Sequence, residues 1–139
     1  MTRYYLLDTN IISEFTKPQP NQKVMERLLA LENVSAISSI TWSELWHGVY
    51  LLPESKKRSH YELFLEEKLS EIYPIISLDK NAGKILGLLQ TATEKSGKTR
   101  SYGDLQIASI AIANNMILVT RNTKDFEHIP NLMMENWFL

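Results

Sequence analysis

The chain has 139 residues, no cysteine and a formal net charge of -1 at pH 7. This length predicts a single domain over residues 1–139, and the lack of cysteine excludes disulfides and thiolate metal sites. The charge excludes a global positive field, so local basic patches would have to hold a polyanion. Because no signal pattern and no apolar run near ~20 residues is present, we expect a soluble, cytoplasmic protein that does not span a membrane.

The first predicted element is a buried strand over residues 4–7. This run of bulky apolar or aromatic residues has no alternation, as in a strand covered on both faces. It ends at Asp8, which is followed by Thr9 and Asn10. The functional crevice of an open α/β sheet lies outside the carboxyl ends of its strands, so Asp8 stands where chemistry is usually done. Alternatively, Asp8 caps the next helix, with help from Thr9 or Asn10.

Helical and strand patterns alternate along the rest of the chain. Up to residue 71, they predict a short helix at 11–16, a helix capped by Asn21 with a stripe of Val24, Leu28, Leu29 and Leu31, a strand at 34–38, and helices at 41–50 and 54–71. Beyond it, they predict a strand at 75–78, a helix capped by Asp79 that fades at 95–97, a helix at 103–114, and strands at 116–120 and 132–135. The predicted fold is one three-layer α/β/α domain with a mainly parallel sheet.

Polar and acidic side chains recur where these strands end or the next helices begin. They are Asp8, Glu44, Asp104, Asn122 and Asp125, and a parallel sheet would bring all of them to one edge. Converging carboxylates repel one another unless a divalent cation neutralises them. Oxygen ligands without cysteine indicate a hard ion, Mg²⁺ or Mn²⁺. Such an ion lowers the pKa of a bound water and stabilises charge on a pentavalent phosphorus.

Four short motifs occur in order along the chain. They are Leu7-Asp8-Thr9-Asn10, Ser43-Glu44-Leu45 with Gly48, Asp104 followed by Ile107-Ala108, and Val119-Thr120-Arg121-Asn122-Thr123-Lys124-Asp125-Phe126. Each motif is weak alone, but together they resemble the motifs of PIN-domain ribonucleases from Tyr4 to Trp137. Within that family the likeness is to the VapC and FitB type, the toxins of type II toxin–antitoxin systems. The segment from Asp8 to Glu14, with the following Pro18-Gln19-Pro20-Asn21, is especially FitB-like.

The resemblance implies a PIN-like fold, a metal-dependent endoribonuclease acting on RNA, a homodimer, and a small antitoxin with a DNA-binding N-terminus that occludes the site. Asp8, Glu44 and Asp104 match the first three acids of the family, and we expect Asp8 and Asp104 to bind the metal. The fourth position is open. Asn122 stands where some relatives have an acid, and it can accept a hydrogen bond from a metal-bound water but brings no charge. Asp125 restores the charge if its turn points it inward; otherwise it is a helix cap or a surface acid.

Two groups of cations are candidates for substrate contacts. Lys95, Lys98 and Arg100 precede Asp104, and Arg121 adjoins Asn122, so phosphate binding there would place RNA near the metal. The cluster over residues 56–58 is interpreted as a solvated start of a helix.

Three other polar residues have a structural and a functional interpretation. His47 follows Glu44 by one helical turn, but a lone histidine is more often structural than a general base. Thr9 and Thr120 could contact metal-bound water or phosphate, although hydroxyls at strand ends are more often local backbone caps.

Apolar surface on the helices predicts assembly. The face with Trp42 and Trp46 and the stripe of Phe64, Leu65 and Leu69 offer more hydrophobic surface than one sheet face readily covers. Core packing or a partner-binding surface is a better interpretation of the tryptophans than base stacking. We therefore expect a two-fold homodimer.

Other classes of protein fit less well. A response-regulator receiver needs an acidic pair at the first strand and a phosphorylatable aspartate after the middle strand, and neither is present. A haloacid-dehalogenase-like phosphatase needs a second aspartate where this chain has Asn10. A catalytically weak or inactive PIN fold that only binds a DNA-binding antitoxin is the more serious alternative, because Asn122 weakens the acid set.

Overall fold

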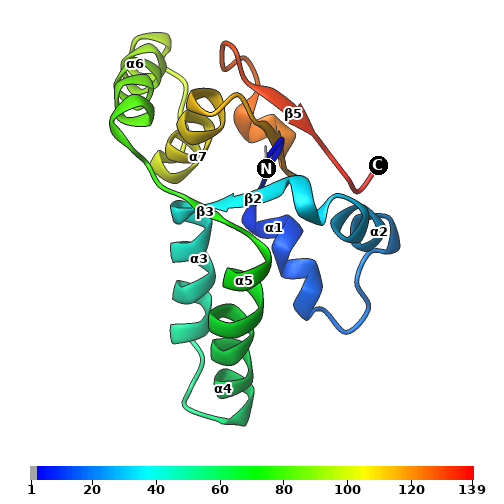
Figure 1. Cartoon of the computed structure of the whole chain (residues 1–139). Coiled ribbons are helices and arrows are strands. Elements are labelled where there is room, and N and C mark those ends of the chain that lie inside the picture. Colours follow the sequence, from blue (N-terminus) through cyan, green and yellow to red (C-terminus); the bar gives the residue numbers. More distant parts are fainter. Residues whose placement is uncertain (1–2) are drawn as a thin grey trace.

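A five-stranded sheet organises residues 3–139, the part of the chain that the computed structural model describes (Figure 1). Its strand order is β3-β2-β1-β4-β5, and every neighbouring pair is parallel. The strands are β1 (Tyr5–Leu7), β2 (Ser35–Ser38), β3 (Ile75–Ile76), β4 (Ile117–Val119) and β5 (Met133–Glu135). Because β1 lies in the middle of a parallel sheet, its carboxyl end adjoins those of β2 and β4. The predicted three-layer α/β/α fold is confirmed.

Helical segments connect all the strands. Between β1 and β3 they are α1 (Thr9–Ile12), the 3₁₀ turns η1 (Ser13–Thr16) and η2 (Glu32–Val34), α2 (Gln22–Ala30), α3 (Ser39–Tyr50), α4 (Lys56–Leu63), the π-helical η3 (Phe64–Leu69) and α5 (Ser70–Ile72). After β3 they are α6 (Lys80–Ser96), α7 (Tyr102–Ala113) and the 3₁₀ turn η4 (Thr123–Phe126). Within residues 3–139, none of these helices is both long enough and apolar enough to cross a bilayer.

Side chains along the strands point alternately to the two faces of the sheet, so each face has its own hydrophobic core. Leu6, Ala36 and Leu118 point to the face covered by α6 and α7. Their neighbours point to the opposite face, where α1, α2, α3 and η3 pack. Figure 1 shows this division, with α6 and α7 together on one side of the sheet and α3 to α5 on the other. The central strand β1 and its neighbour β4 are apolar or aromatic at every position because both faces of the sheet are covered there.

Side-chain caps begin the helices that carry the polar residues. Ser38, the last residue of β2, accepts the Thr41 N–H at 3.0 Å and starts α3. Ser101 accepts the Asp104 N–H at 3.0 Å and starts α7. The predicted caps Asn21 and Asp79 are both confirmed. Each cap satisfies an N–H that the first turn leaves without an intrahelical partner, so the helix starts are defined locally.

Several predicted boundaries and faces are wrong. The first helix starts at Thr9 and not at residue 11, because Asp8 caps it, and the strand predicted at 75–78 is only Ile75–Ile76. The helix predicted at 54–71 starts at Lys56, since Ser55 caps it, and it contains the π-helical η3. Leu29 is 77% exposed because α2 turns Val24 and Leu28 toward the core instead.

Candidate active site

Asp8 lies immediately after β1 and is both a helix cap and a pocket residue. Its Oδ1 accepts the N–H of Thr9 at 2.8 Å, which starts α1. Its Oδ2 accepts the Thr120 hydroxyl at 2.8 Å and the Asn10 side-chain amide at 3.2 Å. Only 6% of the Asp8 surface is exposed. Three donors from two neighbouring strand ends therefore hold one buried carboxylate.

Glu44 reaches the same place from the second turn of α3. Its Oε1 accepts the hydroxyl of Thr9 at 2.6 Å, so α1 and α3 are joined through their side chains. A methyl group at Gly103 would lie 3.9 Å from Glu44 Oε2, which places this carboxylate against the first turn of α7. Glu44 is thereby fixed between Asp8 on one side and Asp104 on the other.

A cleft of about 400 Å³ brings these acids together. It includes Asp8, Glu44, Asp104 and Asn122, four of the five predicted site residues, which come from the ends of β1 and β4 and from α3 and α7. The rest of its wall is formed by Thr9, Asn10, Ser13, Lys17 and Arg121. The prediction that a parallel sheet gathers them at one edge is confirmed.

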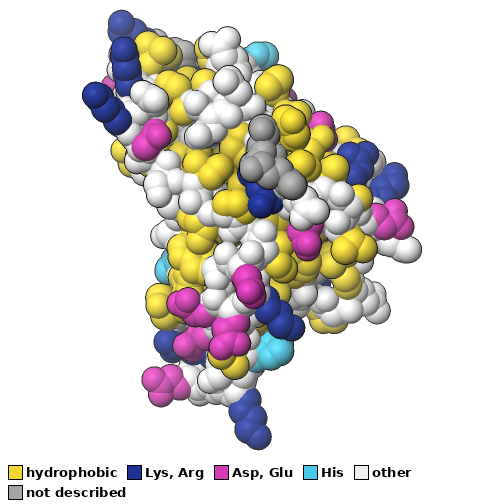
Figure 2. Space-filling model, viewed as in Figure 1, with side chains coloured by type: hydrophobic (Ala, Val, Ile, Leu, Met, Phe, Trp, Pro, Cys, Tyr) yellow, Lys and Arg dark blue, Asp and Glu magenta, His cyan; other side chains and the backbone are white. Residues whose placement is uncertain are grey.

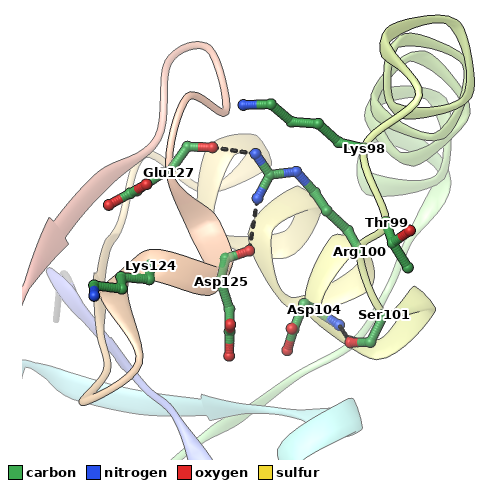
Figure 3. A pocket seen from close by; sticks show the side chains of 8 residues that line it. All are labelled: Lys98, Thr99, Arg100, Ser101, Asp104, Lys124, Asp125 and Glu127. Carbon is green, nitrogen blue, oxygen red and sulfur yellow. Dashed lines mark hydrogen bonds between the residues drawn. The ribbon is translucent and has the colours of Figure 1, made fainter.

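Asp125 lines an adjoining cleft of about 440 Å³ that shares Asp104 with the first (Figure 3). The side chains of Asp104 and Asp125 point side by side into this cleft. The Asp125 N–H donates to the carbonyl of Asn122 at 3.0 Å, which forms the tight turn of η4. The turn therefore directs Asp125 toward Asp104 while leaving its side chain exposed, and Asn122 lies in the first cleft.

The Arg100 guanidinium contacts backbone carbonyls of the protein, whereas the sequence predicted that it binds phosphate. Its guanidinium donates to the carbonyl of Asp125 at 2.6 Å and to the carbonyl of Glu127 (Figure 3). These bonds tie the loop before α7 to η4. Lys98 and Lys124 line the same cleft. Arg100 thus holds Asp125 beside Asp104, and two of its donors are engaged with backbone carbonyls.

The acids perturb one another electrostatically. Burial raises the pKa of Asp8 above its ordinary value, and the negative charge of Asp125 adds to this. Burial also raises the pKa of Glu44, with contributions from Asp8 and Asp104. The pKa of Asp104 is raised by burial and by the charges of Asp8 and Asp125, against the opposing effect of Arg100. The ionised cluster is therefore under repulsion that a cation would relieve.

Other candidate residues lie away from the acids or have structural partners. His47 is exposed and lines neither cleft. In the basic cluster at 56–58, Arg58 pairs with Glu62 at 3.0 Å, consistent with a solvated start of a helix. Lys95 lines neither cleft. The positions of His47, Arg58 and Lys95 therefore do not support a role in catalysis.

The expected local backbone contact is confirmed for Thr120, whose hydroxyl oxygen accepts the Asn122 N–H at 3.1 Å, but the hydroxyls of Thr9 and Thr120 also belong to the site. Both donate to carboxylates of the site, Thr9 to Glu44 and Thr120 to Asp8. Asn10 was given no site role, yet it bonds Asp8 and accepts the Arg121 N–H at 3.0 Å. Its place in the contiguous Asp-Thr-Asn motif was the available signal.

Comparisons with known proteins agree with this geometry. The PIN domain model matches residues 5–132. The chain belongs to the PIN domain family. Ribonuclease VapC2 of Rickettsia felis is 41% identical over 134 residues, covering 96% of this chain and 97% of the relative. Toxin FitB of Neisseria gonorrhoeae is 35% identical over 125 residues, covering 87% of this chain and 89% of the relative.

A solved structure extends the agreement to three dimensions. The crystal structure of VapBC2 from Rickettsia felis, bound to a DNA fragment from their promoter, contains a chain similar to this one with a TM-score of 0.81. The two chains are 36% identical, and the match covers 96% of this chain and 98% of that one. The resemblance inferred from the four motifs is thus confirmed, and the acidic cleft is the cleft of a PIN domain.

The raised pKa of Glu44 predicts a pH-dependent gain in stability for Glu44→Gln without metal. Glutamine can still accept the Thr9 hydroxyl but carries no charge. A group with a raised folded-state pKa destabilises the fold when ionised, so we expect the variant to melt at a higher temperature between about pH 7 and pH 8. The difference should shrink as the pH falls to about pH 3, below the ordinary pKa of glutamate, where the group is protonated in both states.

Thermal melts in EDTA measure this difference across the pH range. Glu26→Gln, which removes an exposed carboxylate from α2, is the matched control. An equal gain in both variants, or a gain for Glu44→Gln that grows toward low pH, would contradict the electrostatic account. Because Glu44 is partly solvated, we expect a gain below about 1 kcal/mol.

Proposed function

We propose that this PIN domain is the toxin of a toxin–antitoxin pair and acts as an endoribonuclease that hydrolyses RNA phosphodiester bonds. The observation that carries the proposal is the convergence of Asp8, Glu44, Asp104 and Asp125 on two adjoining clefts. Relatives that match nearly the whole chain are named ribonuclease and toxin. An acid cluster of this kind suits the activation of a water for attack on phosphorus.

A divalent cation fits the donor set of these clefts. Oxygen donors line them without any histidine, and the chain has no cysteine, which favours Mg²⁺ or Mn²⁺. Within residues 3–139, no three acidic or imidazole side chains are already grouped as a metal site. Mg²⁺ is commonly bound by one or two carboxylates with several waters and does not need such a group. Asp8 and Asp104 are the proposed ligands, with Glu44 beside them.

The side chains of the site would orient the carboxylate oxygens that accept hydrogen bonds or bind the cation, and would accept a proton. When bound, a divalent cation stabilises negative charge on phosphoryl oxygens and acidifies a water molecule. Thr120, Asn10 and the Thr9 N–H direct the Asp8 carboxylate, and the Thr9 hydroxyl directs Glu44. Glu44 and Asp125, with their carboxylates beside the proposed ligands, are placed to accept a proton from the attacking water.

An inactive PIN fold that only binds an antitoxin is the alternative. It was favoured by the neutral Asn122 at the fourth position. The inward direction of Asp125 weakens that objection, because a fourth carboxylate lies beside Asp104 (Figure 3). Asp125 is therefore the candidate for the fourth charge, and we favour the active enzyme as the proposal.

We expect RNA cleavage to require Mg²⁺ or Mn²⁺, to stop with EDTA, and to be lost in Asp8→Asn. The loss should exceed the roughly 10–100-fold effect typical of an outer partner of a metal ligand. Asp79→Asn is the matched control, since Asp79 also caps a helix but lies outside both clefts. Cleavage of a labelled RNA measures activity, and bacterial growth arrest measures toxicity.

Each outcome of this experiment bears on one of the two functions. Full cleavage by Asp8→Asn would refute the site. A wild-type chain that arrests no growth and cuts no RNA with either metal would establish the inactive alternative.

The fourth position is tested by comparing Asp125→Asn with Asn122→Ala. If Asp125 supplies the charge, its neutralisation should lower cleavage by roughly 10–100-fold, and Asn122→Ala should have a smaller effect. Single-turnover rates at saturating metal measure the comparison. The reverse ranking would assign the role to Asn122, and equal small losses would mean that three acids suffice.

We also propose a homodimer, but the apolar surface available for it is smaller than the sequence predicted. Leu65 and Leu69 are 3% and 0% exposed and belong to the chain's own core, so this stripe is not a free surface. What remains is the aromatic row on α3, where Trp42 packs against Trp46 and Trp46 against Tyr50. Tyr50 is 60% exposed at the end of this row. Trp42 and Trp46 are partly buried against the chain's own core, so the partly exposed end of this row is the surface that we propose contacts a second copy.

An antitoxin is the second proposed partner. The similar crystal structure contains VapBC2, a toxin–antitoxin pair, bound to promoter DNA. By analogy, we propose a small antitoxin with a DNA-binding N-terminus whose tail crosses the acidic cleft. An arginine or lysine of that tail would pair with the acids and displace the ion.

We expect the free chain to scatter light as a dimer, at twice the chain mass of 16.1 kDa. The antitoxin should inhibit cleavage stoichiometrically and in competition with metal, and coexpression should restore growth. Neutralising the basic residue of its tail should remove the competition. A monomer at micromolar concentration would refute the dimer, and a tight complex that still cuts RNA would refute occlusion.

A further inference from the structure

The wall of the cleft that contains Asp8 carries two cations, Lys17 and Arg121, and in the part of the chain that the structure describes Arg121 is the one whose side chain is left without an ion pair. Lys17, on the same wall, forms an ion pair with the buried Glu14. Arg100, at the adjoining cleft, donates to two backbone carbonyls. Among the described residues, Arg121 is exposed and forms no ion pair or side-chain hydrogen bond with any carboxylate.

An aromatic platform holds the Arg121 side chain in place. The guanidinium carbon lies 4.5 Å from the centre of the Phe138 ring. Phe138 is presented by the C-terminal segment, in which Trp137 is 1% exposed and packs edge-on against Tyr5 of β1 at 5.5 Å. The Asn136 side chain accepts the Phe138 N–H at 2.9 Å. The segment from Asn136 to Phe138 thus positions the Phe138 ring against the Arg121 guanidinium, and this contact is called the seat of Arg121.

The backbone of Arg121 is tied directly to the acid cluster. Its N–H donates to Asn10 Oδ1 at 3.0 Å, and the Asn10 amide donates to Asp8 Oδ2 at 3.2 Å. One asparagine side chain therefore bridges the peptide of Arg121 and the buried carboxylate. This bridge sets the position of Arg121 relative to Asp8.

We propose that Arg121, seated on Phe138, binds an RNA phosphate next to the scissile one and so positions the strand against the acids. This inference rests on the proposed function. Stacking uses the flat face of a guanidinium and leaves its in-plane N–H groups free, and these groups match a phosphate in a bidentate manner. The seat also keeps the charge from collapsing onto the nearby carboxylates, where it would occupy the place proposed for the metal.

The charge distribution favours such a single strong contact. The chain carries a net charge of -1, and on the face shown in Figure 2 lysine and arginine side chains are scattered in small groups. The net charge excludes a global positive field that would hold a polyanion. Local phosphate contacts must supply the attraction, and each one makes binding depend on salt.

Binding is measured separately from cleavage, in the Asp8→Asn background. Fluorescence anisotropy follows a labelled single-stranded RNA at increasing KCl. Adding Arg121→Ala should weaken binding about tenfold and reduce the slope of log affinity against log salt by about 0.7. Arg121→Lys keeps the charge but loses the bidentate guanidinium and its contact with the Phe138 ring. We therefore expect an intermediate RNA affinity with an unchanged salt slope. Phe138→Leu should weaken binding less than Arg121→Ala, also without changing the slope.

Cleavage kinetics in the otherwise wild-type chain give the second measurement. Arg121→Ala should raise KM with little change in kcat, because a flanking phosphate contact is the same in the ground state and the transition state. Lys56→Ala, which removes an exposed lysine at the start of α4, is the matched control and should change neither constant. Melting temperatures verify that the variants fold.

The outcomes separate this inference from the proposed function. Unchanged affinity and salt slope in Arg121→Ala would overturn the inference even if the wild-type chain cuts RNA. A wild-type chain that cuts no RNA would refute the proposed function, while the anisotropy would still decide whether Arg121 binds RNA. Normal RNA binding with a weakened antitoxin complex would assign Arg121 to the protein partner, and would also overturn the inference.

Discussion

The buried carboxylate of Asp8 is the constraint on which the rest of the site depends. An ion in the protein interior is unfavourable unless donors replace its lost water. Three donors do this here, from Thr9, Asn10 and Thr120, and they belong to the segments that follow β1 and β4. The two strand ends are therefore fixed to each other by the charge that they surround. Thr9 extends the same network to Glu44 and α3 through its hydroxyl.

The fold brings further acids close to Asp8, and repulsion among their ionised carboxylates lowers the stability of the folded state. Burial and neighbouring charges raise the pKa of Asp8, Glu44 and Asp104 together, so the ionised cluster is less stable than the same groups would be apart. The helices that carry Glu44 and Asp104 are capped by Ser38 and Ser101, which are not members of the acid cluster, so their starts do not depend on its charge. Arg100 contributes by bonding backbone carbonyls, which holds Asp125 inward without forming an ion pair with its carboxylate.

Much of the framework could be predicted because its determinants are local. Buried strands appear as apolar runs, and Asn21 and Asp79 mark helix starts through their own side chains. Asp8, Glu44 and Asp104 could be assigned to one edge because parallel strands order their carboxyl ends. Some helix starts were misplaced because the caps Asp8 and Ser55 define them, whereas the wrong surface assignment concerns contacts between distant segments. Leu65 and Leu69 looked like a partner surface, but the sheet and neighbouring helices cover them.

The sequence by itself determined the order of the elements, the family motifs and the identity of the acids, since each depends on residues near one another in the chain. Tertiary structure alone decided which polar groups remain free. It engaged Arg100 with carbonyls 25 and 27 residues away and seated Arg121 on Phe138. It also turned Asp125 toward Asp104. These choices depend on distances across the sheet and between loops, and such distances exist only after the chain has packed.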